Sequence, residues 1–110
     1  MNNDRIMSGL GLCAKAGKLV YGVPLVCEAL RRPLAVKLVI ESGDTSANTH
    51  KKLTDKCRYY ETEIIKLAAS GEELASAVGK GGSLGAVAIT DGGLSEMMKR
   101  LLGDSAGGDR

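Results

Sequence analysis

The apolar positions along this chain follow two spacings, and their alternation predicts the secondary structure. Apolar residues three or four positions apart indicate amphipathic helices, and short continuous apolar runs indicate strands covered on both faces. Strands are expected over residues 18–21, 36–40, 63–67 and 84–90. Helices are expected between Asp4 and Gly17, over about 23–32 and 46–60, between Ser70 and Gly79, and from Asp91 to Leu102.

Residues that start and stop helices support these boundaries. Pro24 suits a first helical turn, and Pro33 ends the same helix. Ser70 and Glu73 have the spacing of a capping box. Helices that alternate with strands predict an α/β fold, with helices on both sides of a mixed or parallel sheet. We expect one domain over residues 1–102 and a disordered tail over 103–110.

Composition is ordinary for a soluble globular protein, with 44% hydrophobic and 25% charged residues among 110. No apolar run approaches the roughly 20 residues of a membrane span, and residues 1–5 lack the basic start and apolar core of a signal peptide. A cytoplasmic protein without a membrane partner is therefore expected. The cysteines Cys13, Cys27 and Cys57 lack metal-ligand spacing and are expected to be buried free thiols.

The charge is unevenly distributed along the chain. Residues 1–60 hold ten Lys/Arg and five Asp/Glu, a net charge of +5, whereas residues 61–110 hold five and eight, a net charge of −3. The whole chain carries only +2. This asymmetry is compatible with a face that binds a polyanion, although it is weaker than the balance of a dedicated nucleic-acid binder.

The sequence shows no catalytic constellation, so neither an enzyme nor a cofactor is expected. His50 lies on an apolar stripe without a sequence-visible nucleophile or metal partner, so a packed or capping histidine is expected. Helix capping explains Asp44 and Asp91, and Glu41 follows a strand. The loop over 79–83 lacks the order of a phosphate-binding P-loop and leads into a strand instead of a helix.

The stretch over residues 17–28 is the best candidate for a binding site. Gly22 is expected to open a helix directly after a short strand, which leaves unpaired N–H groups and a positive dipole end facing outward. Such a corner suits phosphate or another anion, although an ordinary strand-to-helix turn has the same pattern. Because Trp and Phe are absent, recognition by shape and backbone is expected rather than base stacking on a sheet.

The run Leu-Cys-Ala-Lys-Ala-Gly-Lys-Leu-Val-Tyr-Gly at residues 12–22 resembles the entry segment of the ribosomal-protein family that binds kink-turn RNA. The match continues at residues 37–40, 52–53, Cys57, 71–74, 77–79 and 86–91. It covers about residues 5–102 and is closest to the small bacterial YlxQ-like branch. The resemblance implies a three-layer α/β/α sandwich with a four-stranded mixed sheet, and a ribosome-associated protein that binds structured RNA.

In that family the start of the second helix and the loop before the last strand hold the RNA. The family's helix motif Gly-x-Asn-Glu-x-x-Lys falls on residues 22–28, where Gly22 matches and Glu28 stands in place of a phosphate-binding lysine. Gly71 stands where a basic residue is expected. The resemblance and the surrounding basic residues give the candidate RNA-binding set Lys15, Lys18, Gly22, Val23, Pro24, Leu25, Glu28, Arg31, Arg32, Lys37, Lys80, Gly81 and Gly82.

Two functions from different classes remain open at this point. In the first, the basic residues surround one corner and bind RNA through charge and shape. In the second, the same face binds a protein, because Val23 and Leu25 are apolar at helix positions that the family exposes to its ligand.

Overall fold

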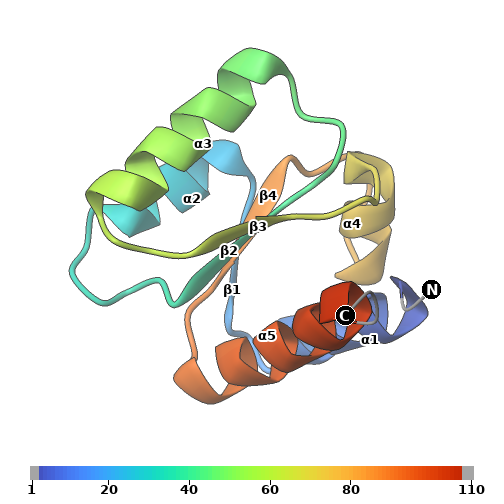
Figure 1. Cartoon of the computed structure of the whole chain (residues 1–110). Helices are drawn as coiled ribbons and strands as arrows, with labels where there is room; N and C mark the ends of the chain where they lie inside the picture. The colour runs from blue at the N-terminus through green and yellow to red at the C-terminus, as the bar shows by residue number, and fades with distance from the viewer. Residues whose placement is uncertain (1–2, 108–110) are drawn as a thin grey trace.

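A four-stranded sheet lies between two layers of helices in the computed structural model, which describes residues 3–107 (Figure 1). The elements are α1 (Asn3–Lys15), β1 (Leu19–Tyr21), α2 (Val23–Leu30), β2 (Leu38–Glu41), α3 (Ala47–Tyr59), β3 (Ile64–Lys66), α4 (Gly71–Ala77), β4 (Ala86–Ile89) and α5 (Gly92–Gly107). The strand order is β1-β4-β2-β3. Because β4 is antiparallel to β1 and β2 whereas β2 and β3 are parallel, the predicted mixed sheet and three-layer sandwich are confirmed.

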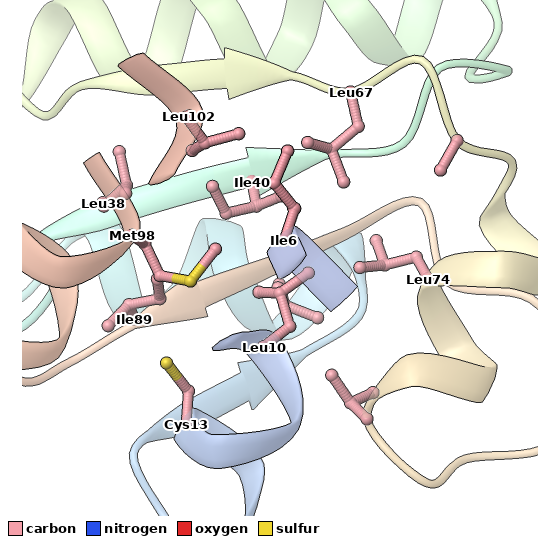
Figure 2. Close-up of a cluster of buried hydrophobic side chains, with 13 residues drawn as sticks. Ile6, Leu10, Cys13, Leu38, Ile40, Leu67, Leu74, Ile89, Met98 and Leu102 are labelled. Carbon is pink, nitrogen blue, oxygen red and sulfur yellow. The ribbon is translucent and has the colours of Figure 1, made fainter. Parts of the chain in front are cut away.

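Alternation along the strands divides the apolar side chains between two cores. In β2, Leu38 and Ile40 face α1, α4 and α5, whereas Val39 faces α2 and α3. Figure 2 shows the first core, whose labelled residues are Ile6, Leu10, Cys13, Leu38, Ile40, Leu67, Leu74, Ile89, Met98 and Leu102. The second core contains Val26, Ala29, Leu30, Val36, Val39, Leu53, Cys57, Ala86 and Ala88. Both faces of the sheet are thus covered, which is why its strands are continuous apolar runs.

The direction of the strands places three strand-to-helix turns at one end of the sheet. Leu19 and Leu38 both pair with Ile89, so β1 and β2 run in the same direction, as does β3. The carboxyl end of the sheet is therefore the end where Tyr21, Glu41 and Lys66 finish these strands. Helices α2, α3 and α4 begin after this end, and β4 starts there. Ligands of open α/β sheets bind outside the carboxyl ends of strands, so this end is where a site is sought.

The last helix differs from the prediction. Residues 103–107 belong to α5 instead of a disordered tail, and residues 108–110 lie outside the described part of the chain. Gly103 weakens a helix by about 1 kcal/mol relative to alanine but removes no hydrogen bond, and no proline follows it. None of the helices over 3–107 is long and apolar enough to span a bilayer.

The cysteines are all free thiols, and two of them are buried. Cys13 and Cys57 lie in opposite cores, whereas Cys27 is half-buried. Burial raises the pKa of Cys57 from 9.0 to about 11, and burial also raises the pKa of Cys13. The raised values reflect the free-energy cost of placing a thiolate in an apolar environment. Both buried thiols are therefore neutral and shielded at neutral pH.

At pH 8 we expect Cys27 to react with a disulfide reagent in the native protein, whereas Cys13 and Cys57 react only after denaturation. Cys27→Ser should remove the native-state reaction. Because the folded pKa of Cys57 exceeds the unfolded value, its contribution to stability is complete below about pH 9 and is lost as the pH rises towards 11. Thiol titration with and without urea tests which cysteines react, and equal reaction of all three thiols in the native state would contradict the expected difference.

Candidate nucleic-acid interface

The junction between β1 and α2 leaves the start of the helix open to a ligand. Gly22 has a φ of +89°, and its N–H donates to the Ala86 carbonyl at 2.9 Å. The helix starts directly afterwards, and no described side chain caps it. Pro24 has no N–H of its own, so the N–H groups of Val23 and Leu25 are the donors at this positive dipole end. The geometry expected for an anion-binding corner is present.

The loop between α4 and β4 lies against this junction. The Lys80 Nζ atom is 4.5 Å from the centre of the Tyr21 ring, a cation–π contact that holds the ammonium group on this ring, whose side chain packs against the first core. A Cβ atom on Gly85 would lie 2.8 Å from Val23 Cγ2, so the end of the loop approaches α2 closely. Gly82 has a φ of +75°, a conformation that glycine adopts without strain. The loop and the start of α2 thus form one exposed surface.

Gly71 allows the same loop to pack on α4. The Gly71 carbonyl accepts from the Leu84 N–H at 3.0 Å. A Cβ atom on Gly71 would overlap Ser83 Oγ and lie 2.9 Å from the Leu84 carbonyl oxygen. Any larger residue here would displace the loop, because the obstacle includes backbone atoms. This packing explains why glycine occupies the position where the family pattern leads one to expect a basic residue.

A buried carboxylate anchors the neighbouring turn. The side chain of Glu41 is fully buried at the end of β2, where its oxygens accept from Thr45 Oγ1 and lie 2.9 and 3.0 Å from His50 Nδ1. His50 is the one basic side chain within 4.0 Å of it in the described part of the chain. A buried charge is strongly destabilising unless it is paired and hydrogen-bonded. This pair therefore fixes the first turn of α3 against the carboxyl end of the sheet.

Three sequence-based interpretations of polar residues can now be compared with the structure. His50 is neither packed in a core nor capping: its side chain is 46% exposed and contacts the Glu41 carboxylate. Capping is confirmed for Asp91, which accepts from Leu94 N–H at 2.9 Å. Asp44 does not cap the helix that follows it, which has Ser46 as its N-cap, and accepts instead from Gly71 N–H at the start of α4, at 3.0 Å. Among the described side chains, no three His, Cys, Asp or Glu residues form a group suited to a metal ion.

Comparison with known proteins identifies the family. The model of the ribosomal protein L7Ae/L30e/S12e/Gadd45 family matches residues 4–99. The chain belongs to this family. The RNA-binding protein YlxQ of Bacillus subtilis (strain 168) is 41% identical over 93 residues, which cover 84% of this chain and 90% of that protein. The corresponding protein of Enterococcus faecium is 34% identical over 101 residues, which cover 92% and 94%.

A ribosomal protein and two solved structures are also similar to this chain. The large ribosomal subunit protein eL30 of Eremothecium gossypii is 29% identical over 91% of this chain and 94% of its own length. A Bacillus halodurans protein of unknown function superimposes with a TM-score of 0.80 at 33% identity, over 87% of this chain and 94% of its own. The Giardia lamblia 15.5kD RNA binding protein has the same fold, with a TM-score of 0.78 at 14% identity, over 94% and 86%.

Seven of the candidate residues lie together at the carboxyl end of the sheet. Four of them form the start of α2, and three form the exposed part of the loop between α4 and β4: Gly22, Val23, Pro24, Leu25, Lys80, Gly81 and Gly82. The structure thus brings together the two segments at which members of the L7Ae/L30e family are expected to hold RNA.

Five of the six basic candidates lie away from this corner, so the expectation that they surround it is wrong. Lys18 and Lys37 lie at the amino end of the sheet, where the Lys18 carbonyl accepts from Thr90 N–H and Lys37 N–H donates to the Ile89 carbonyl. Arg31 and Arg32 follow the last residue of α2, eight residues or about 12 Å along the helix. Lys15 ends α1, on the opposite face of the sheet from α2.

The remaining candidate, Glu28, lies exposed in the second half of α2. Two groups at the site were not predicted: Tyr21, which positions Lys80, and the pair formed by Glu41 and His50. The role of Tyr21 could have been inferred from its position in the sequence, because it is the last strand residue before Gly22. No sequence pattern indicated the contact between Glu41 and His50, since it depends on how the turn after β2 folds back.

Removing either member of the buried pair should lower the free energy of unfolding. A double-mutant cycle of Glu41→Gln and His50→Ala should give a coupling of about 1–3 kcal/mol, because His50→Ala leaves the fully buried Glu41 carboxyl without this partner. The matched control is the exposed pair of Lys51 and Asp55 on the same helix, which should show much weaker coupling. Urea unfolding measures both cycles, and equal couplings would contradict this account.

Proposed function

We propose that this chain is a non-enzymatic, cytoplasmic protein that binds structured RNA through the carboxyl end of its sheet. Family membership supports this proposal, as do the names of relatives described as RNA-binding or ribosomal proteins. The observation that carries it is the uncapped start of α2 facing a glycine loop whose Lys80 is held on Tyr21. A ribosomal RNA or another RNA with a kink-turn is the proposed ligand.

Binding at this surface depends on backbone groups and shape. The N–H groups of Val23 and Leu25 and the dipole of α2 favour a phosphate, and Lys80 adds a positive charge. Gly81 and Gly82 have no side chains that would keep an RNA backbone at a distance. Pro24 and Leu25 offer no side-chain hydrogen bonds to base edges, so contacts that report base identity are few. The proposed recognition is therefore of the kinked RNA backbone more than of its sequence.

The alternative, a protein partner on the same face, has less support from the structure. Leu25 is 59% exposed, as an apolar contact residue should be. Val23, in contrast, packs against the second core and approaches Gly85. A single exposed leucine is common on protein surfaces and does not form an apolar patch.

Exchanging charges at this surface should change RNA affinity and its salt dependence. Lys80→Ala should weaken binding to a kink-turn RNA and reduce the slope of log K against log salt by about 1, because one phosphate contact is lost. Glu28→Lys should strengthen binding and steepen the slope by a similar amount. Filter binding of the kink-turn and a matched unkinked duplex across a salt series measures both.

Arg100→Ala is the matched control, since Arg100 is an exposed basic residue on α5, on the other face of the sheet. It should leave affinity and slope close to those of the unmodified protein. The proposal predicts a preference for the kink-turn that survives moderate salt. Failure to bind either RNA at low salt, or equal effects of Lys80→Ala and Arg100→Ala, would contradict the proposed site.

A further inference from the structure

The amino end of the sheet carries a second concave surface that the proposed function does not use. Helices α2 and α3 both run from the carboxyl to the amino end, and the turns that follow them enclose a cavity of about 290 Å³. Arg31, Arg32 and Leu34 line it from the turn after α2, and Tyr60 and Glu61 line it from the end of α3. It lies at the opposite end of α2 from Gly22.

Both turns contain a residue in an unfavourable backbone conformation. Leu34 has a φ of +62° and Glu61 a φ of +55°, and they are the non-glycine residues with positive φ in the described part of the chain. This conformation brings Cβ close to a carbonyl oxygen, so glycine usually supplies it. Leu34 is also 84% exposed to water. Strained residues of this kind are concentrated at functional sites, where the surrounding structure holds them in place.

The chemistry of this cavity matches one unit of a nucleic-acid strand. Tyr60 lines the cavity, and Tyr59 lies beside it outside the lining. Tyr59 is 79% exposed and contacts Tyr60 edge to face, with ring centres 4.8 Å apart, so Tyr60 supports its orientation. Neither Arg31 nor Arg32 has a carboxylate within 4.0 Å among the described residues. Aromatic rings that stack bases next to guanidinium groups that bind phosphate are the usual components of single-strand sites.

We propose that this cavity and the ring of Tyr59 beside it bind a nucleotide of single-stranded RNA, with its phosphate on Arg31 and Arg32 and its base stacked on Tyr59. Glu61 carries the opposite charge on the other side of the cavity and so directs the phosphate towards the arginines. The choice of RNA as ligand rests on the proposed function, but the site itself is separate. An acidic peptide would satisfy the arginines but would leave the exposed aromatic ring without a stacking partner.

The outer face of α2 connects the two ends of the molecule. Leu25, Glu28 and Arg32 are exposed on it at helical spacing. The helix is about 12 Å long, far shorter than one turn of a nucleic-acid duplex. A single RNA can therefore reach both sites, with its structured part at Gly22 and a single-stranded extension at Tyr59.

Tyrosine fluorescence tests this proposal directly, because the chain contains three tyrosines and no tryptophan. A short oligouridylate should quench the fluorescence of the unmodified protein and of Arg100→Ala equally. Tyr59→Ala and the double change Arg31→Ala, Arg32→Ala should bind the oligonucleotide on the order of ten-fold more weakly. Tyr59→Phe should retain binding, measured by anisotropy of a labelled oligonucleotide, because its ring face is preserved. Polyglutamate should compete poorly.

The outcomes separate this site from the proposed function. Normal oligouridylate binding by folded Tyr59→Ala, or equal competition by polyglutamate, overturns the inference. If Tyr59→Ala were to unfold, Tyr59→Leu, which keeps an apolar side chain of comparable bulk without the flat ring, provides the same test. If neither the unmodified protein nor any variant binds the kink-turn RNA, while oligouridylate binding depends on Tyr59, the site at the carboxyl end is overturned and this one is supported.

Discussion

The hydrogen bond from Gly22 N–H to the Ala86 carbonyl joins the start of α2 to the strand that follows the loop over 80–85. It extends the pairing of β1 with β4 by one residue beyond Tyr21, and it does so in a conformation that a side chain rarely adopts. The helix must then begin immediately, without a capping side chain. The exposed helix start, the position of Lys80 and the approach of Gly85 to Val23 all depend on this junction.

Charge is divided between the two ends of the sheet, which determines how RNA can be held. The carboxyl end has one lysine on its loop and an uncapped helix start, whereas Arg31, Arg32, Lys18 and Lys37 lie towards the amino end. A net charge of +2 provides little long-range attraction. Affinity must then come from geometry: backbone donors at one end, and an aromatic ring with two guanidinium groups at the other.

Features encoded by neighbouring residues could be predicted from the sequence, and features that depend on the register of the strands could not. The capping box of Ser70 and Glu73 and the place of Pro24 in the first turn of α2 are confirmed, because both are local. The expected gathering of basic residues is wrong because α2 carries Arg31 away from Gly22, and because Lys18 precedes β1, whose other end lies at the site. The pairing of Glu41 with His50 required the fold of the turn between them.

The most direct test of the account is the mapping of backbone amide shifts in ¹H–¹⁵N spectra during titration with a kink-turn RNA that has no single-stranded extension. The account predicts that the largest changes occur at Gly22, Val23 and Leu25 and over residues 80–83, with α5 unaffected. Changes centred on the exposed side of α1 around Leu12, with the amides of Val23 and Leu25 unchanged, would contradict it.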